Sequence, residues 1–353
     1  MFPSEIKLGV GTWAWGERLL WGYGQEYNKK DLSAAFRRYL NDGVRFFSTS
    51  PAFGEGDSER ILGEFNAQTP ADLLIATKYV PRPWHLRRGD FMESLKQSLL
   101  RLGLTKLDIL EICPPTGRMT VSRLADCAAE ALELGLVEQV GLSGMDAHQI
   151  DSFNEALSRF GYSIACLETP YNLLERSIEK NGVLDLCHGL NITVLAQQPL
   201  AMGLLTGKYN TEAPASGSRR QLMLRYYMPR LDILLRTMNH IGLENGGKNS
   251  AQVALNWIVR KGVVPIPGTK TLAQAIENAQ TCLAHLPRTN RPPRHPHREN
   301  GSKGSGVIIN IIVKRFIKQN ITQPDITKKM LGAESNLSKG TKEPNNDKGT
   351  KIL

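Results

Sequence analysis

VRFFSTSPAFGEGDSE, residues 44–59, is the stretch of sequence that decides the expected fold. Its first half is a short run of apolar, β-favouring residues, which predicts a buried strand. A Pro- and Gly-rich loop follows, and Asp57-Ser58-Glu59 then begins a helical pattern with an acidic first turn. Small hydroxyl side chains at the end of such a strand lie where parallel α/β folds bind their ligands. A buried strand followed by an ordinary turn explains the same residues equally well.

The same strand–loop–helix unit recurs through residues 1–286. Short apolar runs predict strands at 7–13, 44–50, 73–79, 107–113, 137–144, 165–171, 191–199 and 263–268. Helical periodicity predicts helices at 31–40, 57–65, 89–101, 120–134, 146–160, 174–188, 229–242, 249–260 and 271–286, with a long connection over 202–230. Eight strands that alternate with helices predict an α/β fold of the (β/α)8 TIM-barrel type. An open doubly wound sheet is the competitor, but the first strand–helix turn lacks a GxGxxG fingerprint.

The composition is that of an ordinary globular protein, with 41% apolar and 22% charged residues in a chain of 353. No apolar stretch approaches the ~20 residues of a membrane span, and the first residues show no signal-peptide pattern. The five cysteines are widely spaced and include no CxxC pair. They predict reduced core thiols and a cytoplasmic protein without a metal site.

The net charge of +10 is concentrated at the end of the chain. Residues 287–353 hold 14 Lys and Arg against 5 Asp and Glu, which leaves 30 against 29 in residues 1–286. We therefore expect two parts: a barrel over 1–286, and a basic, low-complexity tail over 287–353 that is mostly disordered. Within the tail, residues 307–313 form an apolar, β-branched run. The tail predicts a contact with a partner but no specific nucleic-acid binding, because no recognition module accompanies it.

The order of motifs resembles that of the aldo-keto reductase family, in its long-loop bacterial, plant and fungal form. The motifs are GVRFF-x-T-x-x-x-x-G, SERILGEF, ATK, LD-I-L, GLVEQVGLS, GLLTGKY and PIPGTK-x-x-x-Q-x-x-EN, over about residues 6–280. The resemblance implies a (β/α)8 barrel that binds NADP(H) across its C-terminal face and reduces small-molecule carbonyl compounds to alcohols.

The catalytic positions that the resemblance implies are largely substituted. The family uses an Asp, a Tyr, a Lys and a His, in which the Tyr donates a proton to the carbonyl oxygen as hydride arrives. Here the Asp position is Ser48, the Tyr position is Phe53, the His position is Cys113, and only Lys78 matches. Phe53 has no hydroxyl, and loss of such a general acid typically costs ~10²–10⁴ in rate.

Lys78 is then expected to be a cation in the barrel lumen without its acidic partner. Desolvation would lower its pKa, which would make it a proton donor near neutral pH, assisted by Tyr23, Tyr27 or His85. A structural lysine capped by Ser48 and carbonyl groups is the alternative, and both interpretations stay open. Tyr79 is no substitute, because strand alternation turns it away from Lys78.

The adenosine end of the cofactor site is kept better than the nicotinamide end. A strand that ends in Gly at a helix N-terminus favours an anion, and Lys270 would distinguish NADP from NAD. The resemblance assigns the 2′-phosphate and adenine to Pro267, Gly268, Thr269, Lys270, Gln274, Glu277 and Asn278. It assigns the pyrophosphate to a long loop with Gly203, Leu205, Lys208 and Arg219, and further cofactor contacts to Thr12, Trp13, Pro199 and Leu200.

At the nicotinamide end, Ser143 is kept where the family binds the carboxamide. Gly144 replaces the usual Asn, Glu168 the usual Gln, and Gln197 the aromatic residue that stacks on the ring. A carboxylate can still accept from the carboxamide NH2. Trp13, Trp15, Trp21 and Tyr23 are expected to line an aromatic substrate mouth, or to be loop packing.

Two classes of function follow from this pattern. The first is an NADP(H)-dependent oxidoreductase that reduces an aldehyde, ketone or quinone with altered acid–base residues. The second is a catalytically silent NADP(H)-binding barrel that serves as a sensor, scaffold or regulatory subunit. A degraded gene product is a third interpretation, suggested by the abrupt onset of the tail.

Overall fold

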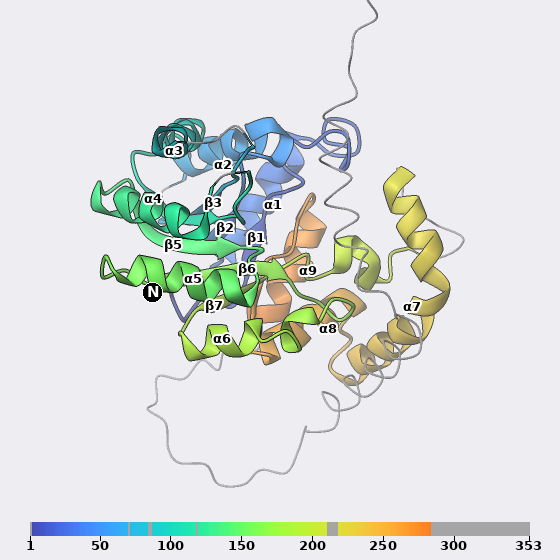
Figure 1. Cartoon of the computed structure of the whole chain (residues 1–353). Coiled ribbons are helices and arrows are strands. Elements are labelled where there is room, and N and C mark those ends of the chain that lie inside the picture. Colours follow the sequence, from blue (N-terminus) through green and yellow to red (C-terminus); the bar gives the residue numbers. More distant parts are fainter. Residues whose placement is uncertain (1, 70, 84–86, 118, 210–217, 284–353) are drawn as a thin grey trace, which may run out of the picture.

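Eight parallel strands form one sheet in the order of the chain, β1 to β8, and the helices surround it (Figure 1). The computed structural model describes residues 2–69, 71–83, 87–117, 119–209 and 218–283, with side chains omitted at 218–230, 282 and 283. The strands are β1 (Gly9–Gly11), β2 (Phe46–Ser48), β3 (Leu74–Tyr79), β4 (Leu107–Ile112), β5 (Val137–Ser143), β6 (Ile164–Pro170), β7 (Thr193–Gln197) and β8 (Val264–Pro265). This confirms the predicted (β/α)8 barrel.

The barrel closes between its first and last strands through glycines. Gly11 and Gly268 form a parallel bridge, and the Gly11 amide donates to the Pro267 carbonyl at 3.2 Å. A Cβ on Gly11 would lie 3.0 Å from the Ile266 carbonyl oxygen, so the two backbones approach closely only because no side chain stands between them.

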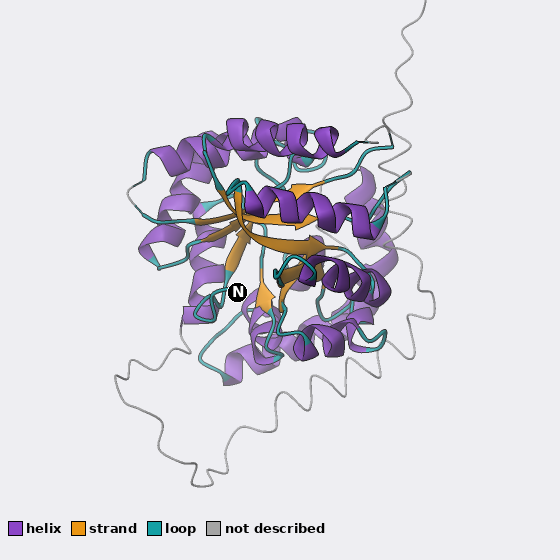
Figure 2. Cartoon of the chain, turned by 60° about the vertical axis from the view of Figure 1, so that its left-hand side comes forward, coloured by secondary structure: helices purple, strands orange, loops and turns teal. Residues whose placement is uncertain are grey.

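Helices cover the outside of the sheet on all sides in Figure 2. They are α1 (Lys29–Asn41), α2 (Asp57–Ala67), α3 (Arg88–Leu102), α4 (Val121–Glu133), α5 (Ala147–Ser158), α6 (Val183–Gly189), α7 (Ser218–Glu244), α8 (Ser250–Arg260) and α9 (Leu272–Leu283). Several begin at side-chain caps that the sequence encodes: Asn28, Asp146 and Asn249 each accept from the backbone one turn into the helix.

Two predicted helices have wrong boundaries. The helix predicted at 174–188 is a 3-10 turn at Ser177–Glu179 followed by α6, because the Asn172 side chain holds an earlier turn and Gly182 has a φ of +81°. The connection predicted over 202–230 contains a 3-10 turn at Ala201–Thr206 and then the first turns of α7. Its polar composition had concealed the helix.

The hydrophobic core has two layers. Inside the barrel, Phe46, Ile109, Leu195 and Ile266 pack together with Phe2 against the inner faces of the strands. Between the strands and the helices lies a larger layer that includes Trp15, Phe36, Phe47 and Phe153. Tyr79 belongs to this outer layer and packs on Phe91, with ring centroids 4.4 Å apart, which confirms that it points away from Lys78.

Several predictions lie outside the described residues, including His85 and the whole of the tail over 287–353. Cys113, Cys127, Cys166 and Cys187 are free thiols. In the described part of the chain, every helix is too short or too polar to cross a membrane.

Candidate active site

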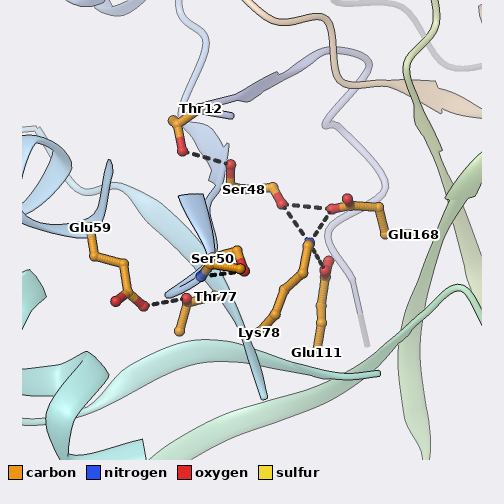
Figure 3. Close-up of polar contacts among 9 residues, drawn as sticks. Thr12, Ser48, Ser50, Glu59, Thr77, Lys78, Glu111 and Glu168 are labelled. Atoms are coloured by element: carbon orange, nitrogen blue, oxygen red, sulfur yellow. Dashed lines mark hydrogen bonds and ion pairs between the residues drawn. The ribbon is translucent and has the colours of Figure 1, made fainter. Parts of the chain in front are cut away.

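The most unusual feature of the barrel lumen is a buried lysine held between two glutamates (Figure 3). Lys78 on β3 is 5% exposed, Glu111 on β4 is 0% exposed and Glu168 on β6 is 2% exposed. All three lie in the C-terminal parts of their strands, where (β/α)8 enzymes carry their active sites. Charged side chains this deeply buried are rare unless they are paired.

The three protons of the Lys78 ammonium group each meet an acceptor. Nζ donates to Oε2 of Glu111, to Oε2 of Glu168 at 2.7 Å and to Oγ of Ser48 at 3.1 Å. Ser48 in turn donates to the same Glu168 oxygen at 2.6 Å. We call these four residues the lumen cluster.

The charges of the lumen cluster determine its protonation. Burial alone would lower the pKa of Lys78, but Glu111 and Glu168 outweigh it and raise that pKa above its ordinary value. Burial, reinforced by the charge of Glu168, raises the pKa of Glu111 to about 8 despite the opposing effect of Lys78. Lys78 is therefore a cation at neutral pH, and Glu111 is the group in this cluster that titrates near neutrality.

The prediction that Lys78 lacks an acidic partner was wrong, and so was the lowered pKa that followed from it. Two carboxylates pair with Lys78 instead: Glu111 on the adjacent strand β4 and Glu168 on β6, across the lumen. The proposed cap by Ser48 is confirmed.

Glu111 was missed by sequence reasoning, although a signal was present. Residues alternate between faces along a strand, so Glu111 shares the lumen-facing side with Cys113, two positions later. Strand register then sets Glu111 directly beside Lys78 on one side and Gly141 on the other. A Cβ on Gly141 would lie 2.7 Å from the Cys166 sulfur and 3.2 Å from Cγ of Glu111, so this glycine makes room for the carboxylate.

Cys113 lies just after β4 and is half-buried. Burial raises the pKa of its thiol to about 12, and a hydrogen bond with Ser143 only partly opposes this. The group is therefore a neutral thiol, able at most to donate a weak hydrogen bond.

Aromatic side chains gather around Phe53, beyond the end of β2. Its ring stacks on that of Trp13 with centroids 6.0 Å apart. The rings of Trp13 and Trp21 form a T-shaped pair with centroids 5.5 Å apart. All three rings are partly exposed. Trp13 and Trp21 of the predicted mouth therefore lie together beside Phe53, and their contact with a substrate stays a prediction.

Trp15 and Tyr27 do not belong to that mouth. Trp15 is completely buried among core rings, and its indole N–H donates to the Thr269 carbonyl at 3.0 Å. Tyr27 is 4% exposed and its hydroxyl donates to the Ala14 carbonyl. The loop turns both inward, so the packing alternative predicted for Trp15 is confirmed, and the Tyr27 hydroxyl that was predicted to assist Lys78 is bound to the Ala14 carbonyl instead. Tyr23 stays partly exposed, and its role stays a prediction.

Lys270 follows β8 and precedes α9, as the anion-site prediction requires. Its ammonium group donates to the Trp21 carbonyl at 2.7 Å, pairs with Glu26 at 3.3 Å and lies 4.6 Å from the centre of the Tyr27 ring. The neighbouring Gly268 is exposed, and a Cβ there would meet only the Gly11 carbonyl, at 3.8 Å. A cation, an open backbone and a helix N-terminus thus lie together.

Other predicted cofactor residues make internal contacts. Thr12 is fully buried and its hydroxyl bonds the Ser48 carbonyl and Ser58, while the Asn278 amide donates to Tyr39 and Thr269. Gln274 accepts from the Lys270 amide and Glu277 from the Asn249 side chain. Pro199 and Leu205 are buried, whereas Gln197, Leu200 and Gly203 are partly exposed and Lys208 is exposed. The side chain of Arg219 lies outside the described part. Their contacts with a cofactor stay predictions.

The backbone after β7 is strained. Gln198, Ala201 and Met202 have φ values of +50°, +49° and +55°, a region that residues other than glycine rarely occupy. Such residues gather at ligand clamps and active sites. This loop carries the predicted pyrophosphate contacts.

A family model for the aldo/keto reductase family matches residues 7–290. The chain belongs to the aldo/keto reductase family. Similar curated proteins include the chloroplastic pyridoxal reductase of Arabidopsis thaliana, 33% identical over 292 residues and covering 79% of each chain. Another is the L-glyceraldehyde 3-phosphate reductase of Escherichia coli strain K12, 28% identical over 294 residues, covering 77% of this chain and 83% of that one.

Solved structures of other family members confirm the fold. The glycerol dehydrogenase of Gluconobacter oxydans has a TM-score of 0.69 at 22% identity, covering 90% of this chain and 93% of the other. An aldo/keto reductase of Klebsiella pneumoniae, in complex with NADP and acetate, has a TM-score of 0.60 at 22% identity over 83% and 94% of the two chains.

As an aldo/keto reductase family member, the chain belongs to a family of oxidoreductases. The lumen cluster contains a buried ammonium group, that of Lys78, paired with Glu111 and Glu168. Among the described residues, no group of three or more His, Cys, Asp and Glu could hold a metal ion.

Proposed function

We propose that this protein is an NADP(H)-dependent oxidoreductase that reduces the carbonyl group of a small molecule, an aromatic aldehyde above all. The observation that carries the proposal is the buried ammonium group of Lys78, fixed at the strand ends close to an aromatic mouth. A cation fixed in a site of low dielectric stabilises negative charge that develops on a carbonyl oxygen.

The residues at the end of β8 fit a phosphorylated nicotinamide cofactor. Lys270 supplies a positive charge, and the positive end of the α9 helix dipole favours an anion. The 2′-phosphate would compete with Glu26 for Lys270. The NADP and NADPH complexes of the Klebsiella pneumoniae proteins support the same cofactor.

When bound, the reduced cofactor supplies a hydride. The protein's own residues have to orient the carbonyl group and supply a proton to its oxygen. Phe53 has no hydroxyl and cannot donate a proton. Its ring and those of Trp13 and Trp21 instead offer a flat apolar surface to the ring of a substrate. Lys78 polarises the oxygen, and the neutral Cys113 thiol adds a weak donor.

An aromatic aldehyde suits this arrangement better than an aliphatic one. Its ring can stack in the mouth, and binding energy from the ring then helps to position the reacting carbon. The name of the Arabidopsis thaliana relative makes pyridoxal the first compound to test.

Turnover measurements test the proposal. Oxidation of NADPH by the purified protein would be followed with pyridoxal, an aliphatic aldehyde and a quinone, with NADH in place of NADPH as control. We expect kcat/KM to be highest with NADPH and pyridoxal. NADPH binding without turnover of any carbonyl would contradict the proposal and would favour the catalytically silent NADP(H)-binding barrel. The cytoplasmic location and the tail contact stay predictions.

A further inference from the structure

The two glutamates of the lumen cluster have unequal hydrogen bonding. Oε2 of Glu168 accepts from both Lys78 and Ser48, at 2.7 and 2.6 Å. Glu111 accepts from Lys78 and faces Glu168 at hydrogen-bonding distance, a contact that needs a proton on one of the two carboxyl groups, and within the described residues its buried Oε1 has no hydrogen-bond partner. Two hydrogen bonds stabilise Glu168 as a carboxylate, whereas a buried, unpartnered oxygen makes the ionised form of Glu111 costly.

The charge balance of the lumen leads to the same assignment. Lys78, Glu168 and an ionised Glu111 would together place one uncompensated negative charge in the buried lumen. The other titratable groups that face Glu111 do not offset it, because Cys113 after β4 and Cys166 on β6 are neutral thiols. A proton on Glu111 makes the cluster neutral.

We propose that Glu111 is the proton-holding residue of this site and that it returns a proton to the Lys78 amine when Lys78 protonates the substrate oxygen. This inference rests on the proposed reductase function. Glu111 would not touch the substrate; it is a positioning residue that acts through Lys78.

The step balances in atoms and charge. The reduced nicotinamide cofactor provides the hydride that forms the new C–H bond, and the C=O π electrons move to the oxygen. That oxygen takes a proton from the Lys78 ammonium group by replacing Ser48, which is the most distant of the three acceptors of Lys78. The Glu111 carboxylic acid passes its proton to the Lys78 amine and becomes a carboxylate, which solvent later reprotonates. Lys78 is thus a cation before and after each turnover.

This arrangement removes the difficulty that Lys78 is itself a weak acid. The proton that is finally given up is the one on Glu111, whose pKa of about 8 is well placed for a general acid at neutral pH. The proton relay from Glu111 through Lys78 would then take the place of the tyrosine hydroxyl that is missing at Phe53.

Infrared spectroscopy tests the protonation without any turnover. The wild-type protein should show a carboxylic acid C=O band at pH 6.5 that disappears as pH rises through about 8, and Glu111→Gln should lack it. Glu168→Gln removes the negative charge that raises the pKa of Glu111, so in this variant the band should disappear at a lower pH than in the wild type. A wild-type spectrum without that band, or a band that persists in Glu111→Gln, would overturn the assignment.

Stability provides a second readout. The glutamine of Glu111→Gln resembles a protonated Glu111, so this variant should unfold at nearly the wild-type urea concentration below pH 4.5, where Glu111 is protonated in both the folded and the unfolded chain. The folded-state pKa of Glu111 is raised above its ordinary 4.5, so its contribution to stability is full below pH 4.5 and is lost as pH rises to about 8. The stability of Glu111→Gln relative to the wild type should therefore increase as pH rises from 4.5 to about 8. Glu168→Gln should be the less stable variant at pH 6.5, and the reverse order would contradict the assignment.

The pH dependence of turnover tests the relay itself. Wild-type kcat should fall at high pH as Glu111 loses its proton, which gives the pH profile a descending limb. In Glu111→Gln kcat should be lower by ~10²–10⁴ and the profile should lack this limb. The affinity of the variant for NADPH should stay within twofold of the wild type. Tyr23→Phe serves as a comparison, since Tyr23 is the other candidate donor. A limb that persists in Glu111→Gln, or one that Tyr23→Phe removes, would overturn the relay. If the wild type binds NADPH but turns over no carbonyl, the relay falls together with the proposed function, while the infrared band still decides the protonation.

Discussion

Two lysines at the C-terminal ends of the barrel strands serve opposite purposes. Lys78 is 5% exposed and has only acceptors within the protein, two of them carboxylates, so its charge is neutralised internally. Lys270 pairs with the half-exposed Glu26, donates to the Trp21 carbonyl and lies near two aromatic rings. The lumen thus holds a buried charge with two carboxyl partners, and we propose that the end of β8 holds one that a phosphate can take over from Glu26.

Lys78→Met would test the first half of this comparison and should have the largest effect. It leaves Glu111 and Glu168 buried without a cation, and breaking a buried ion pair costs about 3–5 kcal/mol. Urea unfolding at pH 7 would measure the loss. Lys270→Met is the control, expected to cost about 0–1 kcal/mol because the pair with Glu26 is partly exposed. Equal losses in the two variants would contradict the comparison.

Lys270→Met should instead affect cofactor choice. A hydrogen bond to a charged group contributes about 1.5–3 kcal/mol, so the affinity for NADPH should fall by roughly 10–150-fold. Affinity for NADH, which has no 2′-phosphate, should change little. Titrations followed by tryptophan fluorescence would measure both. An equal loss for both cofactors would show that Lys270 acts on the fold and not on the phosphate.

Phe53→Tyr should have the smallest effect. It restores the hydroxyl at the family's tyrosine position, but every proton of Lys78 already has an acceptor. We therefore expect kcat to change by less than about tenfold, against the ~10²–10⁴ typical of a working general acid. Steady-state rates with pyridoxal and NADPH would measure it. A gain of more than a hundredfold would mean that Lys78 is free to activate the new hydroxyl.

The barrel could be predicted from the sequence because each of its strands is a short apolar run followed by a helical period. The lumen cluster could not be predicted by transferring family positions alone, since Glu111 is at none of them. It follows from strand alternation and register, which set Glu111 beside Lys78. The choice between mouth and packing for Trp15 needed the structure, because a loop residue has no period from which its direction could be inferred.

Helix boundaries were predicted less well where local polar contacts compete with the helical pattern. The Asn172 side chain accepts from the amides of Leu174 and Glu175, which delays the helix that periodicity would begin there. In α7 only the first turn, residues 218–221, is polar and resembles a loop, and Pro229 inside the helix favoured a later start.

The most direct test of the account is transfer of a deuteride label. The protein would be incubated with pyridoxal and with NADPH that carries deuterium at the transferable position of the nicotinamide. The mass of the alcohol product would then be measured by mass spectrometry. The account predicts one deuterium on the carbinol carbon in the wild type and, at a much lower rate, in Glu111→Gln. An alcohol product without deuterium, or no product in the presence of bound NADPH, would contradict it.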